Sequence, residues 1–243
     1  MIYYADMLTD APPRKAGLAA FRESDRIRTL HLPENGSLVT PAKSLEAAMK
    51  AGKGADVRRF CDEFLNTASD FYAVPRCAIR VLAARPLHVR ENWTSELFGD
   101  YDIENMAIRV WMRTAMKKEI TSFGTFLSTL CHEFCHHLDS QHFRFPHSWH
   151  TRGFFERAGV LYHHARDTAP KRLFWVPVAG GRWRIDWSLP IAARLGSRPL
   201  TSFERFSKMR NTVKIAPTQR TNSKTRVNIL TKVICVKTNT QYR

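Results

Sequence analysis

The most informative stretch of this chain is residues 121–141, TSFGTFLSTLCHEFCHHLDSQ, which has the pattern of an amphipathic helix. On a helical wheel of about 100° per residue, its large apolar side chains share one broad face. The opposite face carries Thr125, Thr129, His132, His136 and Asp139. The pattern predicts a helix that packs its apolar side on a sheet and lines a polar cleft with its other side.

This predicted helix contains an H-E-x-x-H motif made of His132, Glu133 and His136. Residues four apart lie one turn apart on the same face, so both imidazoles can reach one Zn²⁺ at about 2.0–2.1 Å. Glu133 is rotated by about 100° from the first histidine and can reach a water held on the metal. Because zinc lowers the pKa of such a water to about 7, we predict that Glu133 is the general base of a hydrolase.

A catalytic zinc usually needs a third protein ligand, and eight of the ten histidines lie within or shortly after the motif. His142 follows His132 by ten residues, as in the longer motif H-E-x-x-H-x-x-G-x-x-H, but Asp139 stands where that motif has its turn-forming glycine. His150 follows a loop and directly precedes a second predicted helix. We therefore favour His150 as the third ligand, with His142 as the alternative and His147 as a further candidate.

Other polar residues near the motif have weaker claims on the site. Asp139 could hold an imidazole N–H or could be a surface or capping carboxylate. Glu156 is a possible carboxylate ligand, although its place on the second helix argues against that role. His137, rotated by about 100° from His136, is expected at the surface or behind a ligand.

The rest of the sequence predicts an α+β domain around this helix. Apolar residues at steps of three and four predict a helix from Ala55 to a stop before Pro75. Residues 77–113 are predicted to form strands, and 105–113 alternates with a period of two. A substrate could bind extended along that last strand, with Arg109, Trp111 and Arg113 toward the groove or solvent.

The downstream elements and the domain limits complete the prediction. Residues 151–166 are predicted to form the second helix, and 172–187 a hairpin that turns at Gly180–Gly181. We expect a loosely structured segment over 1–54, a catalytic domain over 55–190 and a basic, disordered tail over 191–243.

At two motifs the chain resembles the SprT-like zinc metalloproteases: CHEFCHHLD at 131–139 and HTRGFF at 150–155. The resemblance extends over about residues 55–165. It implies a minimal zincin fold, in which a small sheet packs on the H-E-x-x-H helix and a second helix brings the third ligand. It also implies zinc on His132, His136 and His150, with Glu133 as the base. Thr151 stands where family members often have glycine, and the chain has no cysteines for the zinc ribbon that several members carry.

Composition bounds the partners and the compartment. The formal net charge is +16, but residues 191–243 alone carry 12 Lys or Arg and one acidic residue, Glu204. The tail could therefore bind nucleic acid nonspecifically, while the preceding part is only mildly basic. No signal peptide or membrane segment is recognisable, and the five cysteines suggest no disulfide framework. We expect a cytoplasmic monomer that acts on a protein or peptide substrate.

Two other functions are compatible with the same residues. In the first, the chain is a nucleic-acid-associated protein whose zinc is structural, although structural sites are normally closed by four ligands. In the second, it is a non-catalytic zincin-like interaction module. A Glu133→Ala variant separates the first alternative from the enzyme, because only the enzyme would lose its function. Activity on an unfolded protein separates the second.

Overall fold

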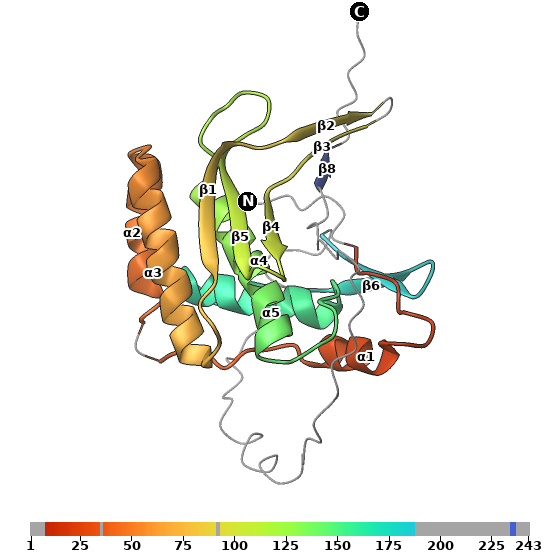
Figure 1. The fold of residues 1–243 in the computed structure, drawn as a ribbon. Helices are drawn as coiled ribbons and strands as arrows, with labels where there is room; N and C mark the ends of the chain where they lie inside the picture. Colours follow the sequence, from red (N-terminus) through yellow and green to blue (C-terminus); the bar gives the residue numbers. More distant parts are fainter. Residues whose placement is uncertain (1–7, 35, 91–92, 188–233, 237–243) are drawn as a thin grey trace, which may run out of the picture.

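A computed structural model describes residues 8–34, 36–90, 93–187 and 234–236 and gives an α+β architecture (Figure 1). Its helices are α1 (Leu18–Arg26), α2 (Val39–Lys50), α3 (Gly54–Tyr72), α4 (Phe123–Gln141) and α5 (Arg152–Ala165). Its strands are β1 (Ala78–Ala84), β2 (Leu87–Arg90), β3 (Trp93–Glu96), β4 (Gly99–Asp102), β5 (Ala107–Arg113), β6 (Trp175–Val178), β7 (Arg182–Ile185) and β8 (Ile234–Val236). The predicted α+β class is confirmed at this level.

The main sheet has three strands in the order β1-β5-β4. Strand β5 is central, parallel to β1 and antiparallel to β4, with Ile79 opposite Ile108 and Tyr101 opposite Ile108 on its other side. Helices α3 and α4 pack on this sheet, and Ile79, Ile108 and Val110 are buried with them in the core. Strand β4 is thus an edge of this sheet, and it contacts α4.

The two long helices of the core form where the apolar periodicity predicts them. Helix α3 buries Val57, Cys61, Phe64, Leu65 and Ala68. It ends at Ala73, whose left-handed backbone (φ 51°) precedes Pro75. Helix α4 begins after Ser122, whose side chain accepts a hydrogen bond from the backbone N–H of Thr125.

The N-terminal region has more regular structure than the loose segment expected over residues 1–54. Helix α2 lies beside α3 in Figure 1, and its Leu45 and Met49 are buried in the core. Pro41 obscures this helix in the sequence, yet it lies in the first turn, where backbone N–H groups have no partner inside the helix. Helix α1 packs on α5. Helices α1 and α2 therefore pack with elements that follow residue 55.

Two smaller sheets complete the described structure. The hairpin β6–β7 turns at Gly180 and Gly181, as predicted, and both glycines have positive φ. In the second sheet, β8 pairs antiparallel with β3, which gives a partner to the only described segment of the predicted tail. The remainder of 191–243, where disorder was predicted, lies outside the described residues. No helix in the described ranges is long and apolar enough to cross a membrane.

Candidate metal centre

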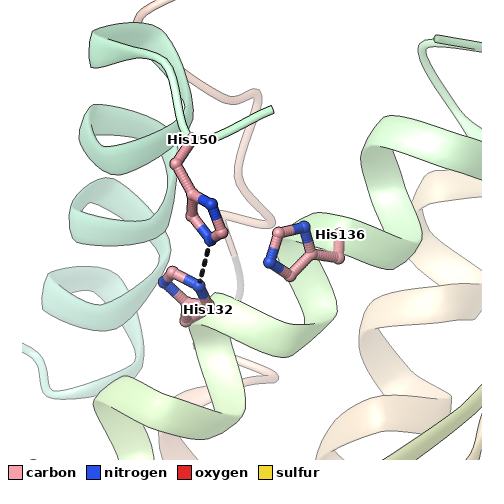
Figure 2. A group of neighbouring side chains, drawn as sticks. All are labelled: His132, His136 and His150. Atoms are coloured by element: carbon pink, nitrogen blue, oxygen red, sulfur yellow. Dashed lines mark hydrogen bonds between the residues drawn. The ribbon is translucent and has the colours of Figure 1, made fainter. Parts of the chain in front are cut away.

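Three histidine side chains from two parts of the chain meet at one point (Figure 2). His132 and His136 come from α4, and His150 lies just before Thr151, the N-cap of α5. One nitrogen of each ring lies within 4.8 Å of those of the other two. All three residues are buried. The structure therefore confirms that these three histidines are positioned to bind a metal ion.

The positions of the ring nitrogens fit a cation between them. Nε2 of His132 lies 3.1 Å from Nε2 of His150. Ligands at about 2.0–2.1 Å in a tetrahedral site would be roughly 3.3 Å apart, close to this separation. Nε2 of His136 is buried and has no hydrogen-bond partner, a costly state for a polar atom unless something binds it. The donor set thus suits a metal that accepts imidazole nitrogens.

A series of buried hydrogen bonds holds His136 through its Nδ1 atom, on the side of the ring away from the metal-binding nitrogen. Its Nδ1 lies 2.7 Å from Oγ of Ser148, and that hydroxyl donates to Oδ2 of Asp139 at 2.9 Å. The other oxygen of Asp139 accepts from Arg157 of α5 at 2.7 Å. Because the hydroxyl hydrogen of Ser148 is donated to Asp139, its oxygen accepts a hydrogen bond from the N–H at Nδ1 of His136, which leaves the lone pair of Nε2 for a metal. Asp139 therefore contacts His136 only through Ser148, whereas the sequence suggested that it could hold an imidazole N–H itself.

Burial sets the protonation of this cluster. It lowers the pKa of His132 and of His136 well below the usual histidine value, and the neighbouring histidines add to the shift. Neutral imidazole is the form that binds metals, so the fold keeps these ligands ready. Burial also raises the pKa of Asp139 to about 6, an effect that Arg157 and Ser148 oppose.

His150 is held by a residue far away in the sequence. The backbone N–H of His150 donates to Oδ2 of Asp10 at 2.9 Å, and the backbone N–H of Asp10 donates to the carbonyl of His150 at 2.9 Å. The same carboxylate oxygen lies 3.4 Å from His150 Nδ1. The N-terminal segment therefore contacts both the backbone and the ring of this ligand.

Glu133, the predicted general base, is fully buried between α4 and the edge strand β4. A Cβ atom added to Gly99 of β4 would lie 2.9 Å from Oε1 of Glu133 and 2.6 Å from Cγ2 of Thr129. Gly99 is therefore needed to leave room for the carboxylate. The carboxylate of Glu133 therefore lies against the face of β4, which is an edge strand among the described residues.

The other candidate ligands are not part of the histidine group. His142 caps the end of α4, where its ring packs against Tyr72 and Phe143. His147 is exposed and its ring contacts Trp149, which itself packs on Phe21. Neither is among the residues that could share the ion, so His150 is favoured over both alternatives.

Glu156 is directed to other partners. Its Oε1 accepts hydrogen bonds from Arg28 at 3.1 Å and from the indole N–H of Trp175 at 2.8 Å. Burial raises the pKa of this carboxyl, while these donors oppose the shift. Glu156 is not in the metal-binding group, in agreement with the argument against it.

Three sequence expectations need correction, and the physical reason in each case is packing. The polar face of α4 is not an open cleft, because Thr129, His132, His136 and Asp139 are all buried and α5 packs on this helix. His137, which was expected at the surface or behind a ligand, is also fully buried. Its ring nitrogens form hydrogen bonds with the hydroxyl of Tyr101 (2.9 Å) and the carbonyl of Pro75 (2.7 Å).

The third correction concerns the strand predicted to receive a substrate. Strand β5 cannot accept another strand, because both of its edges are already paired. Trp111 is buried, and Arg109 is bonded to Asp100 of β4. Within the described residues, β4 is an edge strand of this sheet, and its Gly99 packs against Glu133.

The roles of Asp10, Ser148 and Arg157 were not predicted from the sequence. Ser148 had one available signal, since it is a small hydroxyl residue between two candidate ligands in HSWH. Asp10 and Arg157 had no such signal in the sequence. Asp10 lies 140 residues from its partner His150, and Arg157 lies 18 residues from its partner Asp139. No protein-family model, curated protein or solved structure matches the chain.

Proposed function

We propose that this protein is a zinc-dependent metallopeptidase with a minimal zincin-type fold, similar to the SprT-like proteases. One observation carries the proposal: three buried imidazoles converge on one point, and the carboxylate of the same H-E-x-x-H helix packs against an edge strand. The group contains three ligands, whereas structural zinc sites are normally closed by four. A site with three ligands has an open position for chemistry.

Zinc is the metal that this donor set favours. Three imidazole nitrogens without thiolate are the ligand set of several catalytic zinc sites. The cysteines of α4 do not compete, because Cys131 and Cys135 are buried and burial raises the pKa of both thiols. When bound, zinc supplies a Lewis acid that polarises a carbonyl and lowers the pKa of a coordinated water to about 7.

The residues of the chain supply the rest of the reaction. Glu133 takes a proton from the attacking water and delivers it to the leaving amine, as a general base and then a general acid. Ser148 bonds the ring of His136, and Asp10 faces the ring of His150, so both would keep the ligands oriented. A polypeptide would add along the edge of β4, the strand whose face packs against Glu133.

The test combines metal content with proteolysis. Purified wild-type protein should contain about one zinc per chain and cleave a fluorescently labelled unfolded protein. Glu133→Gln, which keeps the shape of the side chain, should retain zinc and lose at least about 100-fold in rate. Glu156→Gln is the matched control and should keep both properties.

The outcomes separate the three functions. A wild-type chain that binds zinc but cleaves no unfolded protein would favour the non-catalytic module. A chain that binds no zinc, even after zinc is added, would end the metallopeptidase proposal. Cleavage that survives Glu133→Gln unchanged would remove this residue from the mechanism.

A further inference from the structure

The third ligand, His150, lies outside regular structure, and this raises the question of what fixes its position. His132 and His136 are held by the hydrogen bonds of α4, whereas His150 precedes Thr151, the N-cap of α5. A residue before the N-cap makes no helical hydrogen bonds through its own N–H. The carboxylate of Asp10 accepts a hydrogen bond from the His150 N–H, and the backbone N–H of Asp10 donates to the His150 carbonyl. These two bonds fix the backbone on both sides of the His150 Cα atom.

The carboxylate of Asp10 also faces the ring. Oδ2 lies 3.4 Å from Nδ1 of His150, on the side of the ring away from the His132 contact, which is made by Nε2. A carboxylate there favours the proton on Nδ1 and leaves the lone pair of Nε2 for a metal. His136 has the same arrangement, with Ser148 in place of Asp10.

Asp10 is held in turn by the hairpin that follows α5. The backbone N–H of Thr9 donates to the carbonyl of Trp183 in β7, and the N–H of Trp183 donates to Oγ1 of Thr9, both at 2.8 Å. Leu8 forms a bridge with Arg184 of the same strand. Thr9 is almost fully buried. Strand β7 therefore holds Thr9, and the adjacent Asp10 holds His150.

We propose that Asp10 is a positioning residue of the metal centre, and that residues 8–10 docked on β7 are required for a complete three-histidine site. The inference deepens the proposed function, because it rests on the same metal site. It assigns a role in the metal centre to residues 8–10 and to β7, which lie outside α4 and α5. A fragment limited to residues 55–165 would bind metal with two firmly held ligands and one loosely held ligand.

The test measures zinc affinity by competition with a chromophoric chelator, and ligand geometry by the visible spectrum of the Co²⁺-substituted protein. Asp10→Ala should weaken zinc binding by about 10- to 100-fold and alter the Co²⁺ spectrum. Asp10→Asn should lose less, because its amide oxygen still accepts from the His150 N–H. Asp62→Ala, on the exposed side of α3, is the control and should change neither.

The possible results are distinct. If folded Asp10→Ala binds zinc as tightly as wild type, with the wild-type Co²⁺ spectrum, the inference is overturned while the proposed function stands. If wild type itself binds no metal, both fall together. If Asp10→Ala does not fold, Thr9→Val decides: it removes only the hydroxyl that accepts from Trp183 and should weaken zinc binding by a smaller factor. Unchanged affinity in that variant overturns the inference.

Discussion

Replacing Ser148 with alanine should weaken the metal centre without removing a ligand. The hydroxyl joins His136 Nδ1 at 2.7 Å to Asp139 Oδ2 at 2.9 Å, and the side chain is almost fully buried. In Ser148→Ala, Asp139 keeps its bond to Arg157, but the proton of His136 Nδ1 loses its acceptor. The ring is then free to turn or to change tautomer, and either change moves the lone pair of Nε2 away from the metal.

Two independent estimates give the size of this effect. Losing the hydrogen-bond partner of a metal-binding histidine typically costs about 10- to 100-fold in metal affinity. At about 1.4 kcal/mol per tenfold, that is roughly 1.4–2.8 kcal/mol. An unsatisfied buried donor costs about 1–3 kcal/mol by a separate argument. The two ranges agree, so a zinc dissociation constant raised by about 10- to 100-fold is expected.

Chelator competition on the purified, folded variant measures that constant directly. Ser140→Ala on the same helix is the control, since the hydroxyl of Ser140 accepts only from the neighbouring Gln141 among the hydrogen bonds described for it. Far-UV circular dichroism verifies that both variants remain folded. A Ser148→Ala protein with wild-type zinc affinity would refute the reasoning, because it would show that the bridge does not orient His136.

Three further predictions concern the surroundings of the site. Gly99→Ala places a Cβ atom 2.9 Å from Oε1 of Glu133. Steady-state kinetics of proteolysis should show a rate at least about tenfold lower, while zinc content stays near wild type. A wild-type rate of proteolysis would contradict the close packing. Gly153→Ala places a Cβ atom 2.0 Å from a carbonyl oxygen of α1, and urea unfolding should show a loss of about 1–3 kcal/mol or more; unchanged stability would mean that α1 does not dock there. Burial lowers the pKa of His163 to about 4 from 6.5, so the unfolded chain binds a proton that the folded chain does not. The free energy of unfolding should therefore fall as pH drops from about 6.5 toward 4. His163→Gln should make this fall less steep in urea titrations, while His132 and His136, whose pKa values are also lowered, maintain part of it.

The sequence predicts the local part of the site well. The i, i+4 spacing places His132 and His136 on one face of α4, and the structure confirms that both contribute to the group. The apolar periodicity of α3 and α4 likewise predicts both helices and their buried sides. These features depend only on residues within a turn or two of one another, and a helical wheel represents such distances directly.

The N-terminal region shows where local patterns are insufficient. Helix α2 is stabilised by packing Leu45 and Met49 on α3, while its own sequence contains a proline that suggests a break. Helix α1 is anchored by Asp25, which accepts from the backbone N–H of Arg152 at 3.0 Å. Most helical stability in proteins comes from such tertiary contacts rather than from propensity, so a weak local signal does not predict a loose segment.

By itself, the sequence determined the H-E-x-x-H helix, its two histidines and the adjacent carboxylate, because their relation is fixed by 3.6 residues per turn. The sequence favoured His150 as the third ligand and left His142 open, and only the tertiary structure placed His150 with the other two histidines. The choice of His150 over His142 depends on the path of the chain after α4 and on Asp10, whose contact spans 140 residues. The tertiary structure also showed that β4, which packs against Glu133, is an edge strand of the described sheet, whereas β5 is central. Contacts between residues so far apart leave no periodic trace in the sequence, since they arise only when separate elements pack together.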